Sequence, residues 1–257
     1  MEKITSSQNK TVKNVVKLKQ AKQRRECGMF IAEGIKLIRE LVNEDFKIKY
    51  CFASDKADLS ELPSNIDKKT IFISTQNVME KISSLTTPQD FIAVCEQKNI
   101  NVSDTKEDFI LALDNIQDPS NIGAILRSAE AFGVKAVVLS QDCCDVYSPK
   151  ALRAAMGSTF RLNLIKTDLK EFLSFKKDLG YDIIGTGLDK SYKTIDKLCE
   201  SSKKVVVIGN EGSGISNDIK PVCSFGMYIP MYGKNESLNA AVAASIILWE
   251  NKRQNNE

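Results

Sequence analysis

Three segments in the second half of the chain carry polar side chains directly after short apolar runs. The first, residues 113–134, places Asp114, Asn115, Asn121 and Arg127 after one such run and along the helix expected to follow it. In open parallel α/β sheets, ligands bind beyond the carboxyl ends of the strands, so these side chains are candidates for ligand contact. The structural alternative is that Asn121 caps the helix and Arg127 is a surface cation.

The second segment, VVVIGNEGSGIS at residues 205–216, places Gly209, Gly212 and Gly214 around Glu211. Glycine permits positive φ and lets the backbone approach a ligand closely. The segment is not a P-loop, because no Gly-Lys-Ser/Thr follows, and neither it nor GTGLDKSY after the preceding strand fits G-x-G-x-x-G. A dinucleotide site is therefore disfavoured. The structural alternative is a tight turn between a strand and a helix.

The third segment, IPMYGKNESLNAAVA at residues 229–243, joins a strand to an Ala-rich helix. Ser237 and Asn239 are expected at the N-terminus of that helix, where polar side chains and free backbone N–H groups can hold a ligand. N-capping explains one of these two residues, and not obviously both.

The chain has no histidine. A Ser-His or Cys-His nucleophile pair, a His metal ligand and a His general base are therefore excluded.

The seven cysteines include no C-x-x-C pair, so neither a zinc site nor a disulfide scaffold is expected, and no metal is predicted. They are typical of buried thiols in a reducing compartment, and the adjacent Cys143 and Cys144 are the only place for a redox role. The start, MEKITSSQNK, lacks the apolar core of a signal peptide, and no run of about 18 apolar residues is present, so a cytoplasmic protein without a membrane partner is expected.

The net charge of +3 conceals an uneven distribution. Residues 1–25 carry eight Lys and Arg against one Glu, a net of +7, which leaves 28 basic and 32 acidic side chains, a net of −4, in the rest. A helix capped by Ser6 or Ser7, with Val12, Val15 and Val16 on one stripe, would turn its lysines outward. Such a basic arm is expected to meet phosphates, and a solvated helix face is the alternative. The residues expected to bind the phosphates of a nucleic acid are Lys10, Lys13, Lys17, Arg24 and Arg25.

The pattern of apolar runs predicts two domains. In residues 1–97, a strand leading into a helix at GMFIAEGIKLIRELV and strand-like runs at 47–53, 69–74 and 91–96 indicate a small α/β domain. The polar residues 98–108 are expected to be a linker. In residues 109–257, runs FILALDNI, VKAVVLS, YDIIGTG, KVVVIGN and MYIPM alternate with helical stretches, which predicts a parallel sheet covered by helices on both faces. The first helix is expected to start at Asn121 and stop at Gly133, and the last, 236–250, to be buried against another helix or a second subunit.

The three polar segments described first, at residues 113–134, 205–216 and 229–243, resemble the motifs of a known family. In order and with high specificity, residues 109–250 resemble the three motifs of the SpoU (TrmH) family of RNA 2′-O-ribose methyltransferases. The N-terminal part is similar to the small RNA-binding domain that precedes the catalytic domain in many ribosomal-RNA members, with AEG at 32–34 and SLTTPQ at 84–89 as its marks. Where such members often have Gly after Pro-Gln, this chain has Asp90.

The resemblance implies a fold that topology rules would have discarded, an α/β domain whose C-terminal segment threads into a deep trefoil knot. It implies that S-adenosylmethionine binds bent in the knot and that a homodimer completes each active site. Carried over residue by residue, it implies two sets of site residues. The cofactor contacts are Gly187, Gly209, Asn210, Ile229 and Leu238. The catalytic set is Asn121, Arg127, Glu211, Ser237 and Asn239.

The reaction that the resemblance implies is transfer of a methyl group from the sulfonium to a ribose 2′-oxygen. The protein must align the reactants and help the hydroxyl lose its proton. Because a guanidinium stays protonated, Arg127 is expected to orient the ribose or a phosphate and stabilise the developing alkoxide, with the base left open. Asn121 would hold the hydroxyl or Arg127, and Glu211 would orient Arg127 or the motif loops. Ser237 and Asn239 would shape the pocket.

Three alternatives remain at the sequence level. By analogy, the additional N-terminal domain favours ribosomal RNA as the partner over transfer RNA. A non-catalytic RNA-binding protein could keep the fold and lose methyl transfer, although all five polar positions are intact. A nucleotide-dependent oxidoreductase is a distant third, distinguished by binding of NAD in place of S-adenosylmethionine.

Overall fold

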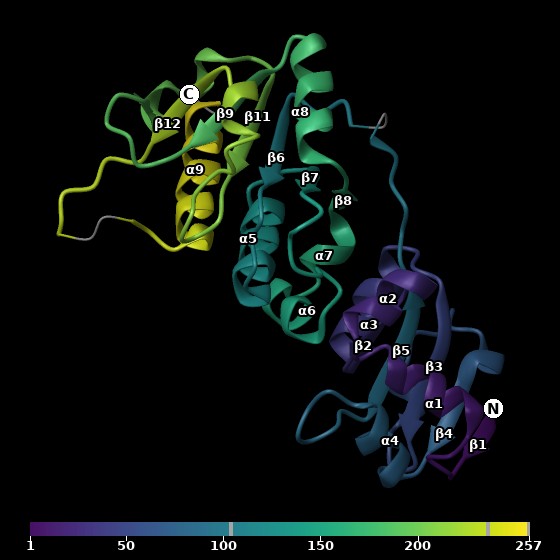
Figure 1. The fold of residues 1–257 in the computed structure, drawn as a ribbon. Helices are drawn as coiled ribbons and strands as arrows, with labels where there is room; N and C mark the ends of the chain where they lie inside the picture. Colours follow the sequence, from purple (N-terminus) through teal and green to yellow (C-terminus); the bar gives the residue numbers. More distant parts are fainter. Residues whose placement is uncertain (103–104, 235–236, 256–257) are drawn as a thin grey trace. The chain divides into compact units, whose positions relative to one another are not determined.

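The computed structural model describes residues 1–102, 105–234 and 237–255, and the chain forms two compact units (Figure 1). Unit 1 comprises Met1–Lys98 and Tyr147–Phe160, and unit 2 comprises Asn99–Val146 and Arg161–Glu257. The sequence pattern places residues 147–160 in the second domain, whereas their contacts place them in unit 1. The expected linker, 98–108, includes residues 103–104, which lie outside the described residues.

Unit 1 is built on a five-stranded mixed sheet in the order β1-β4-β3-β5-β2. Strands β1, β4 and β3 are parallel to one another, whereas β5 is antiparallel to both β3 and β2. The strands are β1 (Glu2–Ile4), β2 (Met29–Glu33), β3 (Ile48–Ser54), β4 (Ile71–Ser74) and β5 (Phe91–Glu96). The helices are α1 (Lys10–Lys17), α2 (Ala21–Cys27), α3 (Ile35–Asn43), α4 (Gln76–Ile82), α6 (Pro149–Ala155) and α7 (Ser158–Arg161), with 3-10 turns η1 (Leu59–Glu61) and η2 (Lys68–Thr70).

The basic N-terminal stretch is part of the folded unit and not a separate arm. Strand β1, which the sequence pattern did not predict, pairs with β4. Helix α1 is capped by Asn9, whose side-chain oxygen accepts from Thr11 N at 2.8 Å, so the expected cap at Ser6 or Ser7 is wrong. Val12 and Val15 are buried in the core beneath the sheet, as the apolar stripe predicts.

Aromatic rings hold the segment 147–160 in unit 1. The ring of Tyr147 stacks on Phe30 of β2 with centroids 4.6 Å apart, and the ring of Phe160 lies 5.9 Å from Phe30 and 5.2 Å from Phe46. All four side chains are buried, and offset stacking adds to the free energy gained by burying their area.

Unit 2 contains a seven-stranded sheet in the order β10-β12-β9-β11-β6-β7-β8, and every pair is parallel, which confirms the predicted parallel sheet. The strands are β6 (Phe109–Leu113), β7 (Ala136–Leu139), β8 (Asn163–Lys166), β9 (Asp182–Thr186), β10 (Lys193–Thr194), β11 (Lys204–Ile208) and β12 (Phe225–Tyr228). The helices are α5 (Pro119–Ala131), α8 (Leu169–Asp178) and α9 (Ala240–Gln254), with 3-10 turns η4 (Ile195–Glu200) and η5 (Lys220–Val222).

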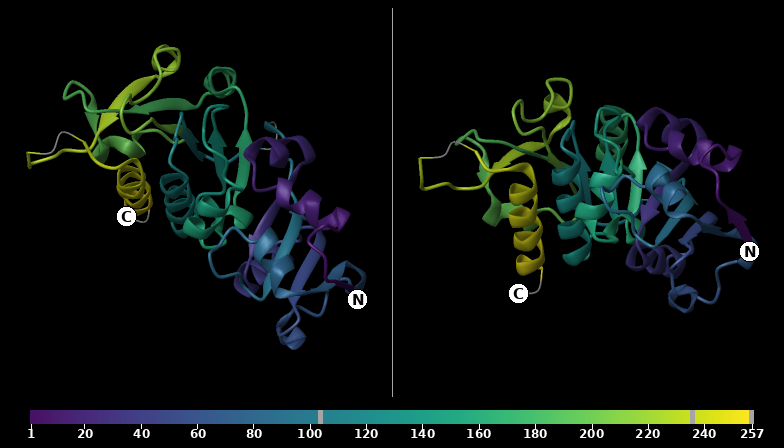
Figure 2. Two further views of the ribbon diagram at one scale, coloured as in Figure 1. Left: turned by 60° about the horizontal axis from the view of Figure 1, so that its bottom comes forward. Right: turned by 90° about the horizontal axis from the view of Figure 1, so that it is seen from below.

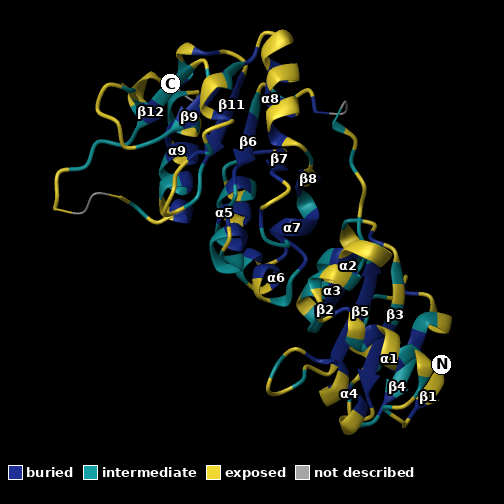
Figure 3. Cartoon of the chain, viewed as in Figure 1, coloured by how far each residue is buried: buried dark blue, intermediate teal, exposed yellow. Residues whose placement is uncertain are grey.

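Helices cover both faces of this sheet. Helices α5 and α9 lie on one side and α8 lies on the other (Figure 2). The central strands β6, β7 and β11 are buried, while the helices turn exposed residues outward (Figure 3). Strands buried on both faces explain the continuous Val, Ile and Leu runs in the sequence.

The two helices that flank the candidate site begin at positions other than those predicted. Helix α5 is capped by Asp118, whose carboxylate accepts from Ser120 N, so Asn121 lies inside the first turn and is not the cap. Gly133, at φ +79°, ends the helix as expected. Helix α9 begins at Ala240 with Asn239 as its cap, and Glu236, the expected first residue, lies outside the described residues.

Helix α9 packs against another helix, one of the two neighbours predicted for it. The helix packs against α5, and the hydroxyls of Ser128 and Ser245 lie 2.7 Å apart across this contact. On another face, Val242 and Trp249 keep 47% and 51% of their surface exposed.

Candidate active site

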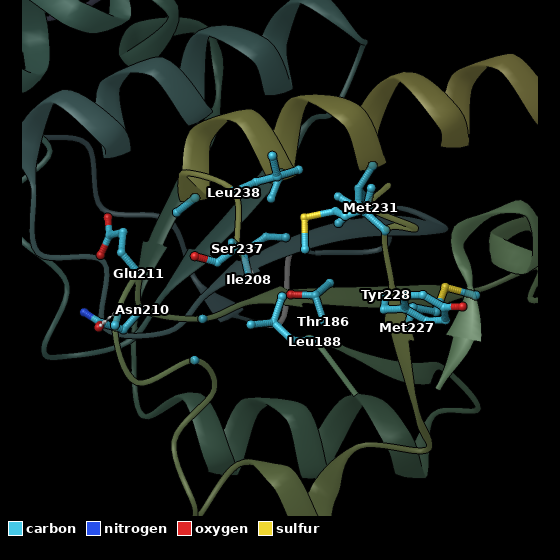
Figure 4. A pocket seen from close by; sticks show the side chains of 18 residues that line it. Thr186, Leu188, Ile208, Asn210, Glu211, Met227, Tyr228, Met231, Ser237 and Leu238 are labelled. Atoms are coloured by element: carbon cyan, nitrogen blue, oxygen red, sulfur yellow. Dashed lines mark hydrogen bonds between the residues drawn. The ribbon is translucent and has the colours of Figure 1, made fainter. Parts of the chain in front are cut away.

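A pocket of about 140 Å³ lies at the carboxyl ends of β9, β11 and β12. The last residues of these strands, Thr186, Ile208 and Tyr228, line it together with the loops that follow them and the start of α9. Figure 4 shows Ser237 and Leu238 beneath the first turn of α9, with Glu211 and Asn210 at one end of the pocket and Met227 and Tyr228 at the other. The pocket therefore occupies the place where parallel α/β sheets bind ligands.

The structure brings the expected cofactor contacts together. All five, Gly187, Gly209, Asn210, Ile229 and Leu238, line this one pocket. So do Glu211 and Ser237 of the expected catalytic set. The rest of the lining is mainly apolar, with Ile208, Met227, Met231 and Ile247 among its members, so polar contacts to a ligand would come largely from the backbone of the loops.

The glycines of the second segment allow this loop to fold tightly on itself. A Cβ on Gly209 would lie 2.3 Å from the carbonyl carbon of Gly214 and from the nitrogen of Ile215. This close approach lets Asn210 and Gly214 exchange two backbone hydrogen bonds, at 3.0 and 2.9 Å. The Asn210 side chain then accepts from Gly212 N at 2.9 Å, which closes the loop. The tight turn that the sequence left as an alternative therefore exists, and it forms one wall of the pocket.

Asp114, which the sequence makes a candidate for ligand contact, and Ser216, for which no role is predicted, join the first and second segments. The carboxylate of Asp114, 3% exposed, accepts from Ser216 N at 2.7 Å and from the Ser216 hydroxyl. In addition, the Asn210 side chain donates to Asn115 O at 2.9 Å. Asp114 directly follows a buried strand, and this position was the available signal. Ser216 has no comparable signal, because its partner is 102 residues away in the sequence.

Three members of the expected catalytic set form a hydrogen-bonded chain across the three segments. The Asn121 side-chain nitrogen donates to Glu211 Oε1 at 2.6 Å. The Asn239 side-chain nitrogen donates to Asn121 Oδ1 at 3.0 Å, while Asn239 Oδ1 accepts from Ala241 N at 2.9 Å. Asn239 is therefore both the cap of α9 and a partner of Asn121, and both the nitrogen and the oxygen of the Asn121 side-chain amide form hydrogen bonds.

Arg127 lies apart from this network. It is exposed on α5, and within residues 1–102, 105–234 and 237–255 its guanidinium makes no hydrogen bond or ion pair. The expectation that Asn121 or Glu211 holds Arg127 is not met in this structure, because those two side chains bind each other. The guanidinium is therefore free to bind a group from outside the chain. Ser237 is exposed, and it is one of the residues that line the pocket (Figure 4).

Four of the five side chains expected to bind RNA, Lys10, Lys13, Lys17 and Arg25, are exposed in unit 1. Arg24 is not, so its assignment to RNA is wrong: it is 3% exposed, and its guanidinium donates to Leu18 O at 2.7 Å and to Lys19 O at 3.0 Å. The carbonyl groups after α1 accept hydrogen bonds from this guanidinium in place of water. The position of an arginine within a basic run does not reveal such a contact.

The adjacent cysteines lie in the loop after β7. Burial raises the pKa of the Cys143 thiol, which donates to Leu113 O at 3.2 Å, and burial raises the pKa of Cys144 to about 12. Both are free thiols, and thiols that stay protonated at neutral pH are poor nucleophiles. In the described part of the chain, no group of three or more Cys, Asp or Glu side chains is placed to hold a metal, and no helix is long and apolar enough to cross a membrane.

The fold and the site define an α/β enzyme with a parallel sheet, whose pocket is formed by the loops after β9, β11 and β12 and by the start of the last helix. Residues 108–249 match the model of the SpoU rRNA Methylase family, and the chain belongs to that family. Residues 9–93 match the MRM3-like substrate binding domain. The resemblance seen in the sequence is confirmed.

Relatives are similar over nearly the whole chain. The 23S rRNA (guanosine(2553)-2'-O)-methyltransferase RlmP of Bacillus subtilis is 29% identical over 97% of this chain and 98% of its own length. The AdoMet-bound rRNA methyltransferase of Sinorhizobium meliloti has a TM-score of 0.88 and 27% identity, with 98% of each chain covered. The SpoU methyltransferase AviRb of Streptomyces viridochromogenes, in complex with AdoMet, has a TM-score of 0.85 and 25% identity over 97% of this chain and 99% of its own.

Proposed function

We propose that this protein transfers a methyl group from S-adenosylmethionine to a ribose 2′-hydroxyl of ribosomal RNA. The observation that carries the proposal is the hydrogen-bonded chain Asn239–Asn121–Glu211, which joins three segments distant in sequence and ends at Glu211 in the pocket lining. Membership of the SpoU rRNA methylase family and the whole-length likeness to rRNA 2′-O-methyltransferases supply the reaction and the RNA class.

The pocket suits S-adenosylmethionine. Its apolar side chains, among them Ile208, Met227 and Leu238, can enclose an adenosine, and the backbone of residues 209–214 offers N–H and C=O groups to its polar edges. Gly187, Gly209, Asn210, Ile229 and Leu238 would hold the cofactor. When bound, it supplies an electrophilic methyl group on a sulfonium, which is a good leaving group.

The chain's own side chains position the ribose and stabilise charge. Arg127 presents an unpaired guanidinium to the RNA, where it would orient the ribose or a neighbouring phosphate and stabilise the alkoxide that develops on the 2′-oxygen. Asn121 holds Glu211 at the pocket wall. With Asn121 bound on both sides, Glu211 orients the motif loops, one of the two roles expected for it. Ser237 and Asn239 shape the entrance at the start of α9.

Unit 1 would bind RNA, and the match of residues 9–93 to a substrate binding domain supports this role. Its exposed cations would bind RNA phosphates, and the salt dependence of RNA binding would report the number of phosphates contacted. These cations are Lys10, Lys13, Lys17 and Arg25. Because residues 1–25 supply core side chains, charge-removing substitutions, and not truncation, are the suitable test.

The proposal also includes the homodimer and the C-terminal trefoil knot that the family resemblance implies. The dimer is supported by an apolar groove between α5 and α9, lined by Phe132, Val242, Ile246 and Trp249 among others. An exposed apolar surface of this kind is typical of a protein interface. The knot would include α9, whose first residues line the pocket.

The decisive experiment measures methyl transfer and cofactor binding separately. The purified protein is incubated with S-adenosylmethionine and ribosomal RNA, and 2′-O-methyl sites are mapped, with transfer RNA as the alternative substrate. Arg127→Ala is expected to abolish transfer while the Kd for S-adenosylmethionine stays within about twofold, because this side chain is outside the pocket lining. Equal loss of transfer and cofactor binding would contradict the role assigned to Arg127. Absence of transfer by the unaltered protein to either RNA would favour a non-catalytic RNA-binding protein.

A further inference from the structure

After β12, the described residues 229–234 lead from the pocket to the exposed surface. Residues Ile229 and Met231 on one side of the loop, and Ser237 and Leu238 on the other, line the pocket. The described residues that follow Met231, 232–234, are yellow in Figures 1 and 2 and project away from the body of unit 2. A group that contacts residues 232–234 is therefore at most three positions along the chain from Met231, which lines the pocket.

The aromatic ring at this position has no packing partner. Tyr232 is 97% exposed, more than any other large apolar or aromatic side chain in the described part of unit 2, and it directly follows the pocket-lining Met231. Gly233 and Lys234 come next and are also exposed. The ring contributes little to folding, because it buries almost no surface.

An exposed aromatic ring with a lysine two residues away is suited to single-stranded nucleic acid. Every base has a π-face on which an aromatic side chain can stack, and an ammonium group can bind the adjacent phosphate. Sequence-specific RNA recognition uses unstacked bases in loops and bulges in this way. When a nucleotide is drawn out of its stack to reach an enzyme pocket, the neighbouring base is left with a face that has no stacking partner.

We propose that Tyr232 stacks on a base next to the methylated nucleotide and that Lys234 binds a phosphate beside it. This inference rests on the proposed function and specifies the substrate at that site: a nucleotide in a loop or bulge, and not in a continuous duplex. Tyr232 is then an RNA-contacting residue, separate from the side chains that line the cofactor pocket.

The test compares Tyr232→Ala with Tyr232→Phe at saturating S-adenosylmethionine. Loss of one stacked base is expected to raise the KM for RNA about tenfold in the alanine variant, while the phenylalanine variant keeps the ring and a KM near that of the unaltered protein. The Kd for S-adenosylmethionine should be unchanged in both. Phe175→Ala is the matched control, because Phe175 is a 45% exposed aromatic residue on α8, outside the pocket lining.

Sedimentation velocity and direct RNA binding are also measured, so that the possible outcomes can be told apart. An unchanged KM for RNA in Tyr232→Ala would overturn the inference. So would a change in oligomeric state by sedimentation velocity, since the ring would then pack against a second subunit. If the unaltered protein methylates no RNA, the proposed function fails, and direct RNA binding by the two Tyr232 variants still tests the stacking contact.

Discussion

Alanine substitutions at Gly209 and Gly212, two glycines of one loop, are expected to differ in their effect on cofactor binding and on the free energy of unfolding. In Gly209→Ala the new Cβ would meet backbone atoms of Gly214 and Ile215 at 2.3 Å, whereas in Gly212→Ala it would meet only Asn210 Oδ1, at 3.6 Å. An ordinary contact is about 3.4 Å or more, so Gly209→Ala must separate two backbone segments by roughly 1 Å. Side-chain atoms could rotate away from such a clash, but backbone atoms cannot.

The magnitude follows from what the separation breaks. Opening the loop removes the two backbone hydrogen bonds between Asn210 and Gly214, each worth about 0.5–1.5 kcal/mol, so the loss is about 1–3 kcal/mol. If the cost falls on the loop conformation that binds S-adenosylmethionine, the Kd rises roughly 5- to 150-fold. Gly212→Ala should change neither quantity by more than about 0.5 kcal/mol.

Isothermal titration calorimetry with S-adenosylmethionine and urea unfolding of both variants measure these two quantities. The comparison is internal, because the two glycines lie three positions apart in the same loop. Equal effects of the two substitutions on binding and on the free energy of unfolding would refute the reasoning, since only one of them meets the backbone.

Three further predictions concern other parts of the chain. Arg24→Ala should lower the free energy of unfolding by about 1–3 kcal/mol in urea, because the carbonyls of Leu18 and Lys19 lose a buried donor, while Arg25→Ala at an exposed site should cost less than about 0.5 kcal/mol. Trp249→Glu should convert the proposed dimer to monomers in sedimentation velocity with little change in unfolding, and a dimer of unaltered affinity would exclude this face as the interface. With a folded-state pKa of about 12, Cys144 should be about one part in ten thousand thiolate at pH 8 and react slowly with iodoacetamide, and mass spectrometry that finds it labelled as fast as in urea would contradict its burial.

The location of the site was predictable from the sequence because parallel strands all end at the same edge of their sheet. Segments that follow β9, β11 and β12 meet at one edge of the sheet whatever their separation along the chain, so polar residues after apolar runs are good candidates for one pocket. The parallel sheet itself was predictable for a related reason. Strands buried on both faces need continuous apolar runs, and those runs are visible in the sequence.

Individual contacts were less predictable because several residues compete for each role. Asp118 and Asn121 can both cap a helix, and the Pro at position 119, favoured at the first helical position, decides for Asp118. Arg24 lies among exposed cations in the sequence, yet free carbonyls after α1 bind it. The role of Ser216 depends on a strand end 102 residues earlier, which local patterns do not reveal.

The segment 147–160 has a consequence for the order of synthesis and folding. The chain crosses between the two units three times, after residues 98, 146 and 160. Unit 1 therefore cannot complete its aromatic stack on Phe30 when residue 98 leaves the ribosome, and must wait for Tyr147 and Phe160. By then the first two strands of the second sheet, β6 and β7, have also been made. The two units are thus expected to fold as overlapping events, and a nascent chain stopped before residue 147 would lack both rings that stack on Phe30.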